Sequence, residues 1–196
     1  MTDDDKTLQD SFIPGSADKT PQDYQAAPDE ATALITSLRR LLAGSGTATR
    51  LIQMADSNGV RVRVLRGRDE SVYVPEARWV FMAITPKTVA TPRLALQYAG
   101  ALREVEQNIL GFTRPGVEAD DDSWVTQNAV KNVDVIRHMC QIAQEISQQK
   151  QGDTVFLDSL TDLGHYELYK AFVNKSSDED LLRLYAKLAN IKTREG

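Results

Sequence analysis

The hydrophobic positions at the start of the chain recur with a helical period. Apolar side chains return every three or four residues, and a glycine follows the last turn of each repeat. This spacing predicts two helices, over residues 30–44 and 47–59. Asp29 is expected to cap the first helix, and Ser45 or Thr47 the second.

A period of two replaces the helical period after residue 59. Val60, Val62 and Val64 alternate with Arg61 and Arg63, which predicts a strand with one buried face over residues 60–65. Further strands are expected over residues 71–74 and 78–85, and the second of these is apolar on both faces. Together they predict a small sheet of two or three strands, antiparallel in pairing and packed on helices.

The rest of the chain is predicted to be helical. Thr91 and Pro92 are a good start signal for a helix over Arg93–Gly111. One face of that helix carries Leu94, Tyr98, Ala101, Val105 and Ile109. The next helix, from Ser123 to about Lys150, has a wide apolar stripe and is expected to be central to the core. Two shorter helices follow, over residues 165–174 and from Ser177 to about Lys192.

Composition limits the class of protein. Residues 1–28 are rich in aspartate and poor in apolar surface, which predicts a disordered acidic tail before a single α+β domain at residues 29–196. No stretch approaches the roughly 20 apolar residues of a membrane span, and the acidic N-terminus, which lacks an apolar region, argues against a secretion signal. One cysteine and two histidines are a poor stock for a metal site and fit a reducing cytoplasm. The net charge of −5 argues against nucleic acid as the main partner.

The stretch Tyr98–Gln107, YAGALREVEQ, lies within the helix that starts at Arg93. It resembles the active helix of a bacterial family of uncharacterised, predicted zinc metallopeptidases, which reads like LAHELRHAWQ. The agreeing residues are Ala99, Leu102, Arg103 and Gln107. The order of helices, small sheet, helix and long helix also agrees, over roughly residues 29–175. The resemblance implies a minimal zincin-like fold, in which the metal-binding helix lies against the sheet.

Carried over residue by residue, the resemblance implies a peptidase fold without peptidase chemistry. The first zinc-binding histidine of the family falls on Gly100, the general-base glutamate on Ala101 and the second histidine on Glu104. Asp134 is the nearest counterpart of the acidic residue that completes the site from the next helix. Two carboxylates without imidazole do not make a tetrahedral zinc site of useful affinity, so no cofactor is expected. The candidates for a vestigial cleft are therefore Tyr98, Gly100, Ala101, Glu104 and Asp134.

An ordinary core helix is the competing interpretation of the same window. Gly100 lies between two alanines, and such a flat patch of small residues lets a neighbouring strand or helix approach closely. Glu104, with Arg103 and Glu106, then forms a solvated face. Under this interpretation the chain is an α+β domain unrelated to the zincin-like family.

The two histidines are candidates for a hydrolase whose site the motifs do not reveal. Such a site would hold His138 or His165 in a deep polar pocket, within hydrogen-bond reach of a carboxylate. Cys140 does not converge with His138, because residues two apart on a helix point in different directions. Since Cys140 also lies on the apolar stripe, we expect a buried, inert thiol.

A basic cluster lies along the first predicted strand and just beyond its end, and it offers an RNA-binding alternative. Its members are Arg61, Arg63, Arg66 and Arg68. Asp69 and Glu70 follow at once, and no aromatic residues are interleaved to stack bases. Charged outward residues also commonly protect the exposed edge of a sheet. The sequence therefore predicts a non-catalytic, cytoplasmic domain that binds a protein partner, and under this hypothesis an exposed apolar patch is expected.

Overall fold

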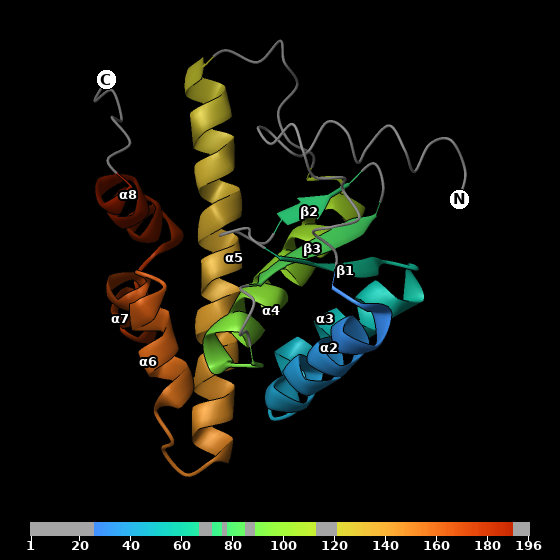
Figure 1. The fold of residues 1–196 in the computed structure, drawn as a ribbon. Helices are drawn as coiled ribbons and strands as arrows, with labels where there is room; N and C mark the ends of the chain where they lie inside the picture. Colours follow the sequence, from blue (N-terminus) through green and yellow to red (C-terminus); the bar gives the residue numbers. More distant parts are fainter. Residues whose placement is uncertain (1–25, 67–71, 76–77, 85–88, 113–120, 190–196) are drawn as a thin grey trace.

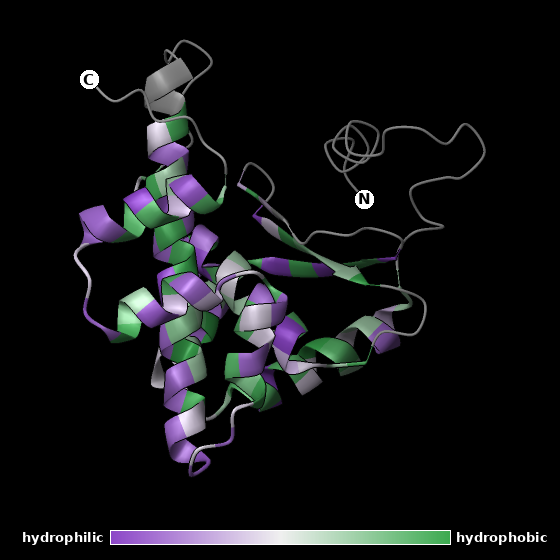
Figure 2. Ribbon diagram, turned by 90° about the vertical axis from the view of Figure 1, so that its left-hand side faces the viewer, coloured by the Kyte–Doolittle hydropathy of each residue, from purple (hydrophilic) through white to green (hydrophobic). Residues whose placement is uncertain are grey.

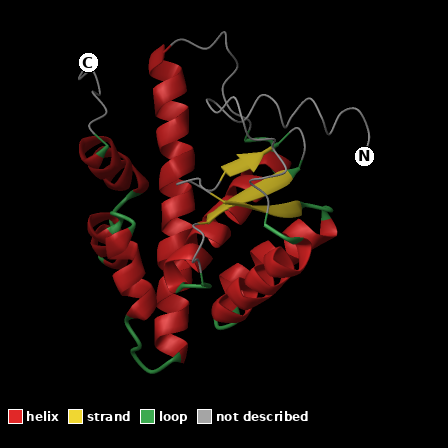
Figure 3. Cartoon of the chain, viewed as in Figure 1, coloured by secondary structure: helices red, strands yellow, loops and turns green. Residues whose placement is uncertain are grey.

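The computed structural model describes residues 26–66, 72–75, 78–84, 89–112 and 121–189, and residues 1–25 of the predicted tail lie outside them. Within these residues two helices precede a three-stranded sheet and five helices follow it, so the α+β class is as predicted (Figures 1 and 3). The helices are α2 (Pro28–Leu42), α3 (Gly46–Ser57), α4 (Pro92–Ile109), α5 (Asp121–Gln149), α6 (Val155–Asp162), α7 (Tyr166–Val173) and α8 (Asp178–Leu188). The strands are β1 (Arg61–Arg66), β2 (Val72–Val74) and β3 (Trp79–Ile84).

Local sequence signals explain the starts of the first two helices. Ser45 caps α3, and its hydroxyl accepts a hydrogen bond from the N–H of Ala48 at 3.0 Å. The cap predicted for α2 is displaced: Ala27 holds the N-cap position and Asp29 lies in the first turn. Proline suits this first turn because its fixed φ is already helical and its missing N–H would have no partner there.

The sheet is mixed, with the order β1–β3–β2. β3 is antiparallel to β2 and parallel to β1, so the predicted antiparallel pairing is correct for the first pair and wrong for the second. β3 takes the central place because it is apolar on both faces: Trp79 and Val80 point to opposite sides and are only 4% and 0% exposed. β1 and β2 are thereby left as the two edges.

Edge strand β1 has one buried and one exposed face, as predicted. Val64 is 2% exposed, whereas Arg61 is exposed. Ala26 is buried beside this strand, and its N–H donates a hydrogen bond to the carbonyl of Val64 at 3.0 Å. Residues 26–28 therefore belong to the domain, ahead of the boundary predicted at Asp29.

Helix α4 lies at the centre of the fold. The sheet, the α2–α3 pair, α5 and α6 all pack on it (Figure 1). Leu96, Tyr98, Leu102 and Val105 are fully buried, whereas Ile109, predicted on the same apolar face, is 45% exposed. Helix α5, which was expected to hold the central place, buries its predicted stripe between α4 on one side and α6, α7 and α8 on the other.

Three helices follow α5 where two were predicted, because α6 was not foreseen. Helix α8 begins as predicted: Ser177 and Asp180 form a reciprocal capping box. The predicted end at Lys192 lies outside the described residues. Hydrophilic and hydrophobic residues are mixed along the long helix α5 (Figure 2), and no helix of the described chain is long and apolar enough to cross a membrane.

Candidate functional site

The window that resembles a metallopeptidase helix is packed shut against α5. A Cβ atom on Gly100 would lie 3.1 Å from Sδ of Met139 and 3.3 Å from Cγ1 of Val135. Ala101 is 5% exposed, and Tyr98 is fully buried with its hydroxyl accepting a hydrogen bond from Nε of Arg39 at 3.2 Å. Gly100 therefore lets two helices approach closely, as the core-helix interpretation predicts.

A cluster of charged and amide side chains lies one turn further along α4. This polar cluster comprises Arg50, Arg103, Glu106, Gln107 and Asp134, from α3, α4 and α5. Nε of Arg103 donates to Oδ2 of Asp134 at 2.6 Å, and its Nη1 pairs with Glu106. Arg50 pairs with the same carboxylate, through both its terminal nitrogens. Nε2 of Gln107 also donates to Oδ2 of Asp134, at 2.6 Å.

The polar cluster corrects the prediction of a solvated face. Glu106 is 8% exposed, and the side chain of Arg103 is 14% exposed. Burial alone would raise the pKa of the Glu106 carboxyl, but hydrogen bonds from Arg50 and Arg103 outweigh it and lower the pKa. The pKa of Asp134 is likewise lowered, because hydrogen bonds from Arg103 and Gln107 outweigh its burial. Both carboxylates are held ionised, and Asp134 engages Arg103 and Gln107.

One of the two histidines lies near a carboxylate, and its ring is held by its own helix. Nδ1 of His138 lies 2.8 Å from the backbone carbonyl of Asp134 and 3.6 Å from its Oδ1. Burial lowers the pKa of His138 and also that of His165, which sits at the N-cap position of α7. Among the described residues, no group of three or more histidine, cysteine or acidic side chains is arranged to hold a metal ion. Cys140 is 1% exposed, and burial raises its pKa to about 12, as expected of an inert thiol.

A small cavity of about 230 Å³ lies beside the polar cluster, between α4, α5 and α8. Arg103, Gln107 and Asp134 line it together with apolar side chains that include Phe112 and Leu182. Oε1 of Gln107 is buried and lacks a hydrogen-bond partner within the described part of the chain. Two of the charged residues that line the cavity, Arg103 and Asp134, pair with each other.

The predicted basic cluster is divided between the two faces of the sheet. The guanidinium groups of Arg61 and Arg63 lie over the ring of Trp79, at 4.5 and 3.1 Å from its centroid. Arg66 instead pairs with Glu30 of α2, and Arg68 lies outside the described residues. The four arginines were predicted to share one cluster, and alternation along the strand separates Arg66 from the other two.

Aromatic residues do accompany the arginines, contrary to the sequence-based expectation. The register places Trp79 opposite Arg61 and Phe81 opposite Arg63, and the two aromatic rings stack at 5.7 Å between centroids. Only the pairing of strands far apart in sequence brings these groups together. Trp79 is nevertheless 4% exposed, so its ring offers little surface for stacking a base.

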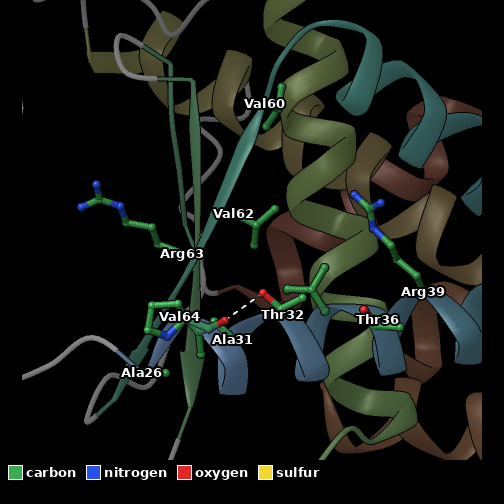
Figure 4. A pocket seen from close by; sticks show the side chains of 11 residues that line it. Ala26, Ala31, Thr32, Thr36, Arg39, Val60, Val62, Arg63 and Val64 are labelled. Carbon is green, nitrogen blue, oxygen red and sulfur yellow. Dashed lines mark hydrogen bonds between the residues drawn. The ribbon is translucent and has the colours of Figure 1, made fainter. Parts of the chain in front are cut away.

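A groove of about 490 Å³ lies between α2 and β1 (Figure 4). Its lining includes apolar and hydroxyl side chains together with Arg39. The α2 wall carries Ala31, Thr32, Ile35, Thr36 and Arg39, and Val60 and Val62 lie at the other wall. Figure 4 shows the Val62 side chain on the groove side of β1 and the Arg63 side chain on the opposite side. We call this feature the α2–β1 groove.

The backbone of β1 forms one lip of the α2–β1 groove. The N–H of Arg61 donates to the carbonyl of Arg78, so Arg61 points its backbone groups toward β3. Successive residues of a strand direct their backbone groups to opposite edges. Val62 and Val64 therefore direct theirs away from β3, toward the outer edge of the sheet. The bond from Ala26 to Val64 confirms that direction. In the part of the chain that is described, the N–H and carbonyl of Val62 have no such backbone partner.

Sequence reasoning missed the polar cluster and the α2–β1 groove for different reasons. The spacing of Arg103, Glu106 and Gln107 was a usable signal, because residues three and four apart share a helix face. The α2–β1 groove has no local signal, since it depends on how α2 and β1 diverge. Comparisons with protein-family models, curated proteins and solved structures found no match to this chain. The functional conclusion therefore depends on the geometry.

Proposed function

We propose that the protein is a non-catalytic interaction domain of the cytoplasm that holds an extended segment of a partner protein in the α2–β1 groove. One observation carries the proposal: a groove of about 490 Å³ whose lip is an edge strand with outward-facing backbone groups at Val62. Grooves of roughly 300–1,000 Å³ are of the size that binds ligands in proteins. Edge strands bind extended peptides through main-chain hydrogen bonds.

The lining of the α2–β1 groove suits side chains of moderate size. Ile35, Val60 and Val62 are partly buried and pack on the core, so they form an apolar surface that is still accessible. Thr32 and Thr36 are exposed on α2 and supply hydroxyl groups along one wall. Burying one valine or leucine of a partner on such a surface contributes about 1.5–3 kcal/mol.

A degenerate zincin-like origin remains part of the proposal. It is supported by the position of α4, which packs on the sheet and on the long helix α5. It is also supported by two residues that agree with the family's helix, Arg103 and Gln107. Both donate to Asp134, the counterpart of the acidic residue on the next helix. In this proposal the polar cluster now ties two helices together where the family has a metal site.

Filling the α2–β1 groove tests the proposal. Thr36→Trp places a large side chain in the groove from an exposed position, and Ala33→Trp is the matched control on the same helix outside the groove lining. Random displayed peptides are selected on the full chain, and their affinities are measured by fluorescence anisotropy. We expect Thr36→Trp to weaken binding by about tenfold or more, which is 1.4 kcal/mol, and Ala33→Trp to leave it unchanged.

Two outcomes would overturn the proposal. In the first, the selected peptides bind Thr36→Trp as tightly as the wild type, or no peptide is enriched at all. In the second, the full chain binds single-stranded oligouridine RNA and loses it when Arg61 and Arg63 are changed to glutamate. That result would assign the function to the aromatic and basic face of the sheet instead.

A further inference from the structure

We infer that the bound segment joins the sheet as a fourth strand beside β1, and that its residues alternate between apolar and acidic. This inference rests on the proposed function and adds to it the backbone geometry and chemical class of the partner. The juxtaposition that carries it is a strand edge with open backbone groups at Val62, which lies between the α2–β1 groove and a basic face.

The backbone of β1 already makes the first hydrogen bond of such an arrangement. Ala26 donates its N–H to the carbonyl of Val64 at 3.0 Å, on the edge away from β3. The next outward-facing residue along the strand is Val62, whose N–H and carbonyl lack a backbone partner among the described residues. Val60 donates its N–H to the carbonyl of Ala55 at 3.0 Å, so an incoming strand would pair with the edge at Val62, between these two bonds. Both the donor and the acceptor of Val62 would then be satisfied.

The position of α2 provides a surface on which the side chains of an added strand would pack. The three-stranded sheet covers α4 through β2 and β3, while β1 diverges from α2 and leaves the α2–β1 groove between them. On the inner face, alternate side chains of an added strand would point into the groove, toward Ile35 and Val62. Apolar side chains suit these positions, because Ile35 and Val62 are themselves apolar.

The outer face of β1 determines which side chains suit the remaining, alternate positions of the added strand. Arg61 is exposed on this face, and the guanidinium of Arg63 lies beside it over Trp79. Side chains of an added strand that alternate with the groove-facing ones would lie next to these two arginines. Opposite charges across neighbouring strands stabilise the pair, and like charges destabilise it. Arg61, which is exposed, therefore favours aspartate or glutamate on this face of the added strand and disfavours a basic segment.

Amide hydrogen exchange at Val62, followed by NMR on the full chain, tests the inference. The probe is a synthetic peptide with the six-residue length of β1 that alternates aspartate and valine. The controls are the same peptide with lysine for aspartate, and a peptide of the same composition with its aspartates and valines in separate blocks. The amide of Arg63, which faces β3, is the internal reference because it belongs to the existing sheet.

In the free protein we expect the amide of Val62 to exchange much faster than that of Arg63. At ten times Kd, the aspartate–valine peptide should slow exchange at Val62 by about tenfold, since only the free fraction exchanges. The reference amide should not change. The lysine peptide and the block peptide should have no effect, and Thr36→Trp should abolish the protection.

Each contrary outcome has a distinct meaning. If displayed peptides bind in the α2–β1 groove but Val62 stays unprotected, or if the lysine peptide works equally well, the fourth strand or its acidic pattern is wrong and the proposed function stands. If Val62 is already protected in the free protein at every concentration, a segment of the chain itself occupies the edge. Protection that grows with protein concentration would identify a second copy. Both of these results overturn the inference of a partner peptide.

Discussion

The polar cluster makes a quantitative prediction for Arg103→Met. Arg103 is the residue that links the carboxylates of Glu106 and Asp134, and its side chain is 14% exposed. Methionine keeps most of the buried aliphatic stem but removes the guanidinium. The change therefore isolates the charged contacts between α4 and α5 from the packing around them.

The expected loss follows from the contacts removed. A hydrogen bond to a charged group contributes about 1.5–3 kcal/mol, and Arg103 makes one to each carboxylate. Glu106 retains Arg50, and Asp134 retains Gln107, so neither carboxylate is left without a donor. We therefore expect a decrease of about 2–4 kcal/mol in the free energy of unfolding, close to the range for breaking a buried ion pair.

Urea denaturation monitored by circular dichroism measures this loss. The matched control is Arg183→Met, because Arg183 pairs with Glu179 at the surface, with side chains 75% and 73% exposed. Removing an exposed pair of this kind costs about 0.3–0.5 kcal/mol. The reasoning is refuted if Arg103→Met lowers stability no more than Arg183→Met does.

The same variant should show a characteristic pH dependence. Arg103 helps to hold the pKa of both Asp134 and Glu106 below the ordinary value, despite the burial that would raise it. A carboxyl with a lowered folded pKa stabilises the fold above its unfolded pKa of about 4 and loses that contribution as the pH falls through the folded pKa. The stability gap between wild type and Arg103→Met should therefore be widest near pH 7 and narrow below about pH 4. A gap that is constant down to low pH would contradict the ion-pair account.

Three further predictions follow from single contacts. Glu145→Ala removes a carboxylate that receives hydrogen bonds at the start of α3, and urea denaturation should show a loss of about 1–3 kcal/mol; an unchanged midpoint would contradict the contact. Cys140 has its pKa raised to about 12, so in the folded protein at pH 8 it should react with a chromogenic disulfide about a thousandfold more slowly than in the protein unfolded by urea. Equal rates in the two states would show an accessible thiol. Gly100→His should lower the free energy of unfolding by about 3 kcal/mol, because the ring has no space against α5. Glu104→His, at a partly exposed position, should lower it by less than about 1 kcal/mol. Equal effects of the two variants in thermal unfolding would refute the closed packing.

Features set by neighbouring residues could be predicted from the sequence. The capping box of α8 depends on Ser177 and Asp180, which lie three apart, and it forms as expected. The alternation in β1 likewise predicted which of its faces is buried. Helix α6 was not predicted, although α7, which has the same length of eight residues, was.

Features that join distant segments could not be predicted in the same way. The parallel pairing of β1 with β3 requires β2 to lie at the far edge, and no local pattern encodes that order. The salt bridge from Arg103 to Asp134 depends on which face of α4 packs on α5, and a helix that is apolar on several sides leaves that choice undetermined. The α2–β1 groove could not be predicted from any local pattern, since its two walls come from separate elements.

The most direct test of the central claim is an NMR titration of the full chain with the alternating aspartate–valine peptide, mapped residue by residue. The account predicts that the largest amide shift changes fall on Val60–Val64 of the strand and Ala31–Thr36 of α2, the two walls of the α2–β1 groove. Changes confined to the cavity beside Arg103 and Phe112, or the absence of any change at saturating peptide, would contradict it.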